Sequence, residues 1–294
     1  MKALLGVLIL LSMTELLENT PASAISSPGP SVAGTLRLHE FKSKVFGNQR
    51  MLRVWLPPGY DDAQNVSRRY PILYLNDGQN LFESSTAFAG VEWQVDETAT
   101  RLILQNAIPP MIIVGIDNAQ KDRVKEYLPY PDDSYQPPVK RVFGKRYPDF
   151  LTQEVMPYIQ RRYRVLRGQE NTSLGGSSYG ALISLYTVIA KPGVFSRLLI
   201  ESPSLYVRDQ EILKESRKQK AWPSRIYLAV GTKETSHDDW NQLALNDVLT
   251  LESILRKSGL DDRRLKVRIE EGGTHSEAAW AGRFPEALTF LFGH

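Results

Sequence analysis

The pattern of apolar and polar positions changes near residue 70. Before that point, residues 35–44 and 50–56 alternate apolar with polar side chains, as antiparallel strands with one buried face do. After it come short apolar runs, which predict strands buried on both faces, as in a parallel sheet. These runs are residues 72–75, 111–116, 172–174, 198–200, 226–230 and 265–269.

Helical stretches lie between these apolar runs. They cover residues 95–105, 149–162, 179–190, 240–258 and 277–292. Buried strands that alternate with amphipathic helices predict a mainly parallel sheet with helices on its two sides. Together with the two leading strands, the pattern predicts an eight-stranded sheet. Because residues 35–294 contain no internal repeat or linker, we expect them to form one α/β domain.

The first residues have the pattern of an export signal. Lys2 precedes an apolar run over residues 3–11, and residues 21–24 carry the A-x-A pattern of a signal-peptidase site. The run is too short for a hydrocarbon core about 30 Å thick. We therefore predict a signal peptide over residues 1–24, a flexible lead-in over residues 25–34, a secreted or periplasmic protein and no membrane span in the mature chain. The alternative is an uncleaved interfacial anchor.

Composition excludes several kinds of chemistry. The 294 residues include no cysteine, which rules out a disulfide, a thiolate zinc site, an iron–sulfur cluster and a cysteine nucleophile. Four histidines are too few for a histidine-rich metal centre, so we expect neither metal nor cofactor. The net charge is +3, without a long run of one sign, and therefore does not indicate a nucleic-acid partner.

One long segment departs from the alternation of strand and helix. Residues 119–146 are rich in proline, tyrosine and basic side chains. Structureless loops of this length are uncommon and often line or cover a site. We expect that role here, with an ordinary surface loop as the alternative.

A candidate nucleophile follows the apolar run at residues 172–174. Gly176-x-Ser178-x-Gly180 fits the G-x-S-x-G turn, in which a serine between strand and helix adopts a strained backbone conformation. The glycines leave room for neighbouring backbone. A phosphate-binding loop would need Lys-Ser or Lys-Thr after its last glycine, whereas Ala181 follows here. We therefore predict that Ser178 is a nucleophile.

His275 is the best candidate for the general base that a serine nucleophile requires. It lies between the last predicted strand and the last helix, at the carboxyl edge of the sheet, where α/β folds carry their sites. The other histidines are less suitable. His39 precedes the serine on an edge-like strand and is expected at the surface, His237 lies in a polar loop, and His294 ends the sequence.

Two glutamates are candidates for the acid that would orient this histidine. Glu234 follows the strand predicted at residues 226–230 and a tight Gly-Thr turn, and it is preferred because that turn would present it above the sheet. Glu201 ends the preceding predicted strand and stays open as the alternative. Asp238 and Asp239 are lesser candidates.

An oxyanion needs two hydrogen-bond donors. One is expected to be the backbone N–H of Tyr179, which directly follows the candidate nucleophile. The other is expected from the loop after the third predicted strand, where we choose the backbone N–H of Gln79.

Taken together, these positions resemble an esterase family of α/β hydrolases that includes esterase D, enterochelin esterases and feruloyl esterases. The resemblance is carried in order by residues 73–82, 92–93, 114–118, 123–127, 175–180, 202–204, 230–234 and 272–280. It implies the α/β-hydrolase fold and a triad that maps onto Ser178, Glu234 and His275. In having a glutamate as the triad acid, the sequence is similar to the mycolyltransferase-type relatives. The extra basic and N-terminal elements of the siderophore esterases are not evident.

The expected function is that of a serine carboxylic-ester hydrolase working through an acyl-enzyme. Its substrate is expected to be a small-molecule or glycan-linked ester. One alternative is an acyltransferase that passes the acyl group to an alcohol or sugar, and the other is a catalytically silent hydrolase-fold binding protein. The physiological ester and the oligomeric state cannot be read from the sequence.

Overall fold

The computed structural model describes residues 32–133 and 137–293. The predicted signal peptide over residues 1–24, most of the predicted lead-in over residues 25–34 and His294 lie outside the described residues. Within them, no helix has the length and apolar character to cross a membrane.

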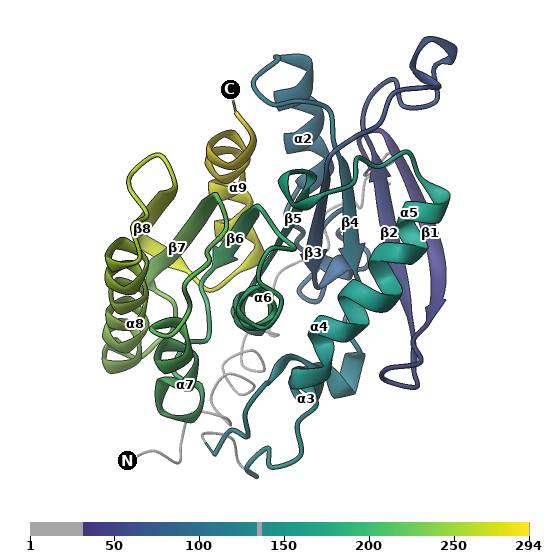
Figure 1. The fold of residues 1–294 in the computed structure, drawn as a ribbon. Helices are drawn as coiled ribbons and strands as arrows, with labels where there is room; N and C mark the ends of the chain where they lie inside the picture. The colour runs from purple at the N-terminus through teal and green to yellow at the C-terminus, as the bar shows by residue number, and fades with distance from the viewer. Residues whose placement is uncertain (1–31, 134–136, 294) are drawn as a thin grey trace, which may run out of the picture.

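An eight-stranded sheet forms the centre of the described part of the chain (Figure 1). Its order is β1-β2-β4-β3-β5-β6-β7-β8. β1 pairs with β2 and β2 with β4 in antiparallel fashion, whereas the other neighbours are parallel, which confirms the predicted mostly parallel sheet. The strands are β1 (Thr35–Lys42), β2 (Gln49–Leu56), β3 (Ile72–Asn76), β4 (Ile112–Ile116), β5 (Thr172–Ser177), β6 (Arg197–Glu201), β7 (Arg225–Lys233) and β8 (Leu265–Thr274).

The central strand β3 carries an unbroken apolar run because it faces two cores. In β3, Ile72 and Tyr74 belong to a core that also contains residues of α5 (Met156–Arg162), α6 (Ser178–Ala190) and α8 (Asp238–Lys257). The intervening residues Leu73 and Leu75 belong to a second core, which contains residues of α2 (Val95–Leu104) and α9 (Glu277–Phe292). Two-sided burial therefore explains the unbroken apolar run of β3.

The structure adds two helices that the sequence did not predict. α3 (Arg123–Tyr127) lies inside the segment over residues 119–146, with the 3₁₀ turns η3 (Gln120–Asp122) and η4 (Gly144–Arg146), so the expectation of a structureless loop was wrong. α7 (Val207–Ser216) follows β6, and three of its residues near the start have left-handed backbone angles. The helix predicted at residues 149–162 is composite, with α4 (Tyr147–Asp149), the π-helix η5 (Phe150–Val155) and then α5.

Parallel strands bring distant loops to one edge of the sheet. Ser177 at the end of β5 pairs with Glu201 of β6, and Glu201 pairs with Ala229 of β7. The residues that follow these strands therefore emerge side by side at the carboxyl edge. This is the edge at which ligands bind in open α/β sheets.

Candidate active site

Ser178 begins α6 directly after β5, and its backbone is strained. Its φ is 56°, in the left-handed region that costs a non-glycine residue roughly 1–3 kcal/mol. A Cβ added to Gly176 would lie 2.8 Å from the carbonyl carbon of Gly180, and one added to Gly180 would lie 3.0 Å from an Asp77 carboxylate oxygen. Glycine is thus required at position 176 and fits the close approach of Asp77 at position 180, and the turn predicted from G-x-S-x-G is present.

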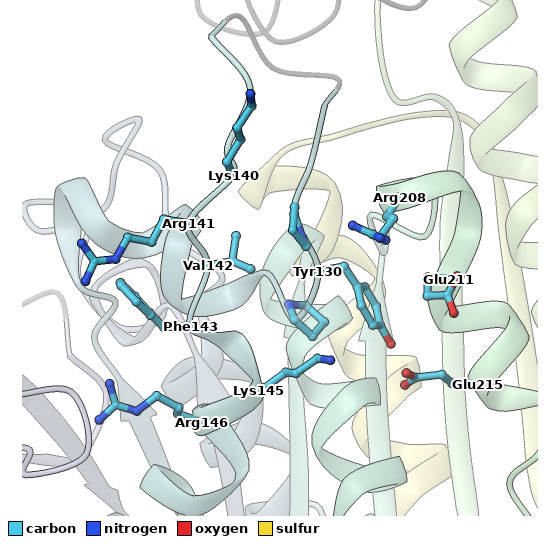
Figure 2. A pocket seen from close by; sticks show the side chains of 12 residues that line it. Tyr130, Lys140, Arg141, Val142, Phe143, Lys145, Arg146, Arg208, Glu211 and Glu215 are labelled. Carbon is cyan, nitrogen blue, oxygen red and sulfur yellow. The ribbon is translucent and has the colours of Figure 1, made fainter.

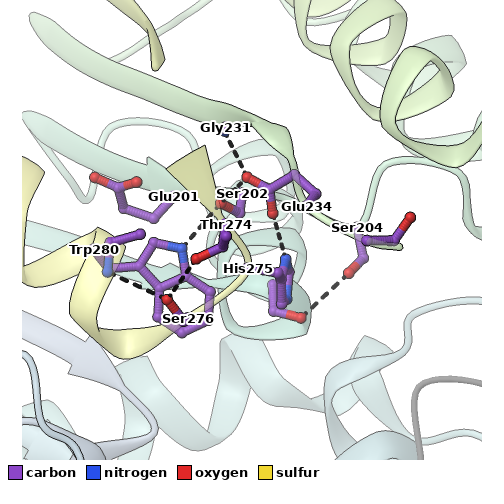
Figure 3. A network of polar contacts seen from close by, with 12 residues as sticks. Glu201, Ser202, Ser204, Gly231, Glu234, Thr274, His275, Ser276 and Trp280 are labelled. Carbon is purple, nitrogen blue, oxygen red and sulfur yellow. Dashed lines mark hydrogen bonds and ion pairs between the residues drawn. The ribbon is translucent and has the colours of Figure 1, made fainter. Parts of the chain in front are cut away.

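His275 and Glu234 come together at the same edge (Figure 3). Nδ1 of His275 lies 2.6 Å from Oε2 of Glu234. The Glu234 side chain is 4% exposed and that of His275 34%. Burial raises the pKa of Glu234, but hydrogen bonds from His275, the Gly231 N–H and the Ser202 hydroxyl outweigh it, so the pKa lies below its ordinary value. The pair can hold the imidazole with Nδ1 toward the acid and Nε2 toward a substrate.

The Ser178 hydroxyl points to a neighbouring serine. Its Oγ lies 3.5 Å from Oγ of Ser204, whose backbone N–H donates to the Ser178 carbonyl over 3.3 Å. Across the described residues, no hydrogen bond joins Ser178 to His275. Catalytic hydrogen bonds are often long or poorly aligned without substrate and tighten once it is bound.

Glu201, the alternative acid, faces a different partner. Its side chain is 1% exposed and accepts a hydrogen bond of 2.9 Å from Nε of Arg283. Burial raises the pKa of Glu201 to about 8, and the Arg283 charge opposes this rise. Because its contact is with Arg283, Glu201 is not placed to orient His275. The lesser candidates Asp238 and Asp239 are exposed in the first turn of α8.

The remaining described histidines form their side-chain and backbone contacts with other residues. His237 is exposed and precedes α8. His39 on β1 is half-buried, which corrects the expectation of a simple surface residue. Its Nε2 lies 2.5 Å from the Tyr163 hydroxyl, and the ring of Tyr158 packs edge-on against it. Burial lowers the pKa of His39.

The loop after β3 presents a backbone donor. In η2 (Gly78–Asn80), the N–H groups of Asn80 and Leu81 donate to the carbonyls of Asp77 and Gly78. The Gln79 N–H has no acceptor among the described residues. A Cβ added to Gly78 would lie 2.5 Å from the carbonyl carbon of Gly115, so this loop is fixed directly against β4.

Arg123 supports the same loop, and our sequence analysis had given it no role. Its Nε and one terminal nitrogen bind the two Asp77 carboxylate oxygens at 2.7 and 2.8 Å. The guanidinium also lies 5.8 Å from the ring centre of Tyr179, the residue after Ser178. It therefore links the loop of Gln79 with the start of α6. Its only sequence signal was its place in the family resemblance.

A cavity of about 630 Å³ lies between the segment over residues 119–146 and α7 (Figure 2). Figure 2 shows the Tyr130 ring between Lys145 and the α7 residues Arg208 and Glu215. The other lining residues are Pro129, Pro131, Lys140, Arg141, Val142, Phe143, Arg146 and Glu211. The segment thus lines a cavity. Since Ser178, Glu234 and His275 do not line it, its use as a substrate site stays a prediction.

Among the described residues, three acidic side chains lie close enough together to hold a metal ion. Glu92, Asp96 and Glu97 bring carboxylate oxygens within 4.8 Å of one another. Burial raises the pKa of Glu92 to about 7 and that of Asp96 to about 8. Protons can therefore neutralise Glu92 and Asp96 near neutral pH. The expectation that the protein uses no metal or cofactor stays a prediction.

Comparison with known families gives one match over most of the chain. The model of the family described as "Putative esterase" matches residues 43–291.

Two curated proteins and one solved structure illustrate the similarity. The chain is 24% identical over 250 residues to the uncharacterized protein YbbA of Bacillus subtilis, covering 84% of this chain and 94% of that protein. It is 31% identical over 276 residues to the siderophore enterobactin esterase of Emericella nidulans, covering 88% of each. The crystal structure of the BES protein from Bacillus cereus has a TM-score of 0.68 at 17% identity, covering 94% of this chain and all of that one, and this likeness concerns the fold.

Proposed function

Because the chain belongs to the "Putative esterase" family and is a carboxylic ester hydrolase with the α/β-hydrolase fold, we propose that it cleaves its substrate through an acyl-enzyme on Ser178. The observation that carries this proposal is the 2.6 Å contact between Glu234 and His275. It lies at the sheet edge that also carries the strained turn of Ser178.

In the first half of the reaction, Oγ of Ser178 attacks the ester carbonyl carbon while Nε2 of His275 takes the hydroxyl proton. The tetrahedral intermediate then collapses, and His275 gives that proton to the departing alcohol. In the second half, His275 takes a proton from water, which attacks the acyl-enzyme. His275 then gives this proton to Oγ of Ser178 as the acid is released. Glu234 keeps the imidazole in the required tautomer and stabilises the imidazolium.

The negative oxygen of each intermediate needs donors that are already in place. We assign this role to the backbone N–H groups of Tyr179 and Gln79. The absence of an acceptor for the Gln79 N–H within the described ranges supports its assignment. One such donor is worth about 10²–10³ in turnover.

We propose a small-molecule ester as the substrate. The name of the relative from Emericella nidulans supports siderophore esters as a class to test, although the sequence did not lead us to expect them. Glycan-linked esters stay a second class. We also propose that residues 35–294 form one catalytic domain and, from the pattern of residues 1–24, that the protein is exported.

Replacing Ser178 tests this proposal. Ser178→Ala should reduce hydrolysis of p-nitrophenyl acetate by at least about 10³-fold without lowering the melting temperature. Ser173→Ala is a matched control, because Ser173 is a buried serine of β5 whose hydroxyl has no partner among the described residues. Ser173→Ala should retain activity. Undiminished hydrolysis by Ser178→Ala would overturn the proposal.

Acyl transfer, the alternative, is distinguished by its products. With an alcohol or sugar acceptor present, a transferase releases the acylated acceptor, whereas a hydrolase releases the free acid. Exclusive formation of the free acid at high acceptor concentration would exclude transfer to that acceptor.

A further inference from the structure

Ser202 directly follows β6 and has a strained backbone. Its φ is 43°, in the left-handed region, and its N–H donates to the Ala229 carbonyl over 2.8 Å. This conformation is energetically unfavourable for serine and persists only where the surrounding structure imposes it. The backbone is therefore held by the neighbouring strand β7, and the hydroxyl contacts Glu234 in the loop after that strand.

The partners of this hydroxyl determine the direction of its hydrogen bonds. Ser202 Oγ lies 2.7 Å from Oε1 of Glu234 and 2.9 Å from Nε1 of Trp280 (Figure 3). It also lies 3.4 Å from a terminal nitrogen of Arg283. Indole and guanidinium nitrogens only donate. The Ser202 oxygen must accept from both of them, and its single proton is left for Glu234.

The two oxygens of Glu234 consequently have separate partners. Oε1 accepts from the Ser202 hydroxyl and from the Gly231 N–H, at 2.7 and 2.6 Å. Oε2 is left for Nδ1 of His275. Two donors on one oxygen fix the plane of the carboxylate, so the other oxygen faces the imidazole. Trp280, which orients the Ser202 hydroxyl, also packs edge-on against the His275 ring at 5.1 Å.

We propose that Ser202 is a positioning residue of the esterase site, whose hydroxyl holds the Glu234 carboxylate with one oxygen facing His275. This inference rests on the proposed function and deepens it. Ser202 acts through Glu234 and touches neither the ester nor Ser178.

Loss of this hydroxyl should change the pKa of Glu234. The donors from His275, Gly231 and Ser202 offset the burial of Glu234, so removing one of them raises its pKa. The charged groups around it come from β6, β8, α9 and the loop after β8, and they are Glu201, Glu270, Arg283 and His275. A Glu234 carboxylate that accepts one hydrogen bond fewer stabilises the protonated imidazole of His275 more strongly, so the acid-side midpoint of kcat/KM against pH should move to higher pH.

Two substitutions separate the hydroxyl from the strained backbone. Ser202→Ala removes the hydroxyl and keeps the strain, whereas Ser202→Gly removes the hydroxyl and accepts the left-handed angle without strain. Both should lower kcat by about 10- to 100-fold, as expected for one lost hydrogen bond to a charged group, with KM nearly unchanged. Both should also move the acid-side midpoint upward. A fully active Ser202→Gly with the wild-type pH profile would overturn the proposal.

Two further variants complete the test: one is a control, and the other disturbs the same hydrogen bond from a second residue. Ser196→Ala removes a buried serine hydroxyl just before the start of β6, where it donates to the Glu170 carbonyl, and it should leave the pH profile unchanged. Trp280→Phe keeps an aromatic ring but removes the indole N–H, so the Ser202 hydroxyl is free to turn. It should move the midpoint in the same direction as Ser202→Gly.

A titration without ester separates this inference from the proposed function. The His275 ring is followed by NMR against pH in Ser178→Ala and in the double variant Ser178→Ala, Ser202→Gly. An upward shift of the midpoint in the double variant supports positioning by Ser202, and an unchanged midpoint overturns it. Failure of the proposed function would instead appear as wild-type hydrolysis that does not depend on Ser178.

Discussion

Oε2 of Glu234 lies 2.6 Å from Nδ1 of His275, although 41 positions separate the two residues in the sequence. The contact joins the loop after β7 to the loop after β8. It gives one oxygen of a buried carboxylate the imidazole of His275 as its partner. The family match supports ester hydrolysis, and this contact supports a specific way of performing it.

The two glutamates should differ sharply when each is made neutral. Glu234→Gln keeps the shape of the side chain but favours the wrong tautomer of His275, so kcat should fall by about 10⁴-fold. Glu201→Gln should keep kcat within about tenfold, because Glu201 bonds Arg283 instead. Steady-state kinetics of both variants at pH 8 checks this. The reverse order of effects would make Glu201 the orienting acid.

Glu201 should also make the stability of the protein depend on pH. Burial raises its pKa to about 8 in the folded state, above the ordinary value, so folding favours the protonated form. That contribution is complete below the ordinary pKa and is lost as the pH rises toward 8. Relative to Glu201→Gln, the wild type should lose about 1 kcal/mol or more between pH 5 and pH 8. Urea unfolding at both pH values measures this, and an opposite slope would mean that Glu201 is ionised by its pairing with Arg283.

Gln79 offers a test of the proposed oxyanion donor. Gln79→Pro removes the N–H, which proline tolerates in a first helical turn, and kcat should fall by about 10²–10³-fold. Gln79→Ala keeps the N–H and loses only the side-chain oxygen that accepts from the Asn118 N–H over 3.2 Å. It should retain most of the activity. Equal losses in two folded variants would contradict a role for the backbone donor.

The effect of replacing a glycine by alanine should depend on the space available for the added Cβ. Gly176→Ala forces a Cβ to within 2.8 Å of the Gly180 backbone, so the turn of Ser178 must shift and both activity and melting temperature should fall. Gly282→Ala lies in the exposed interior of α9 with nothing within 4 Å, and it should stabilise by about 0.5–1 kcal/mol. Thermal unfolding and turnover of both variants check this. A Gly176→Ala variant with wild-type activity would show that the turn does not need glycine there.

Strand periodicity was enough to predict the sheet, since two-sided burial leaves a direct trace in the apolar runs. α7 escaped prediction because left-handed residues interrupt its start, from Arg208 to Gln210. The helix at Arg123 escaped because it has only five residues and lies in a segment rich in proline and basic side chains.

The residues of the candidate site also differ in how far the sequence alone predicts them. Ser178 and His275 are marked by local pattern and by position after a strand. The choice between Glu234 and Glu201 depends on which of them faces His275 and which faces Arg283, and that is a property of tertiary packing. Ser202 lies in a phrase of the family resemblance, but its role could not be predicted, because that role depends on contacts with residues 32 and 78 positions away.

The most direct test of the account is to locate the covalent adduct formed with a serine-reactive fluorophosphonate. Peptide mass spectrometry should find one adduct per chain, on Ser178, with ester hydrolysis lost in proportion to labelling. Labelling should be absent in Ser178→Ala and much slower in His275→Gln, because the hydroxyl is reactive only beside its base. Ester hydrolysis that continues unchanged while Ser178 carries no adduct, or an adduct on another side chain that abolishes activity, would contradict the account.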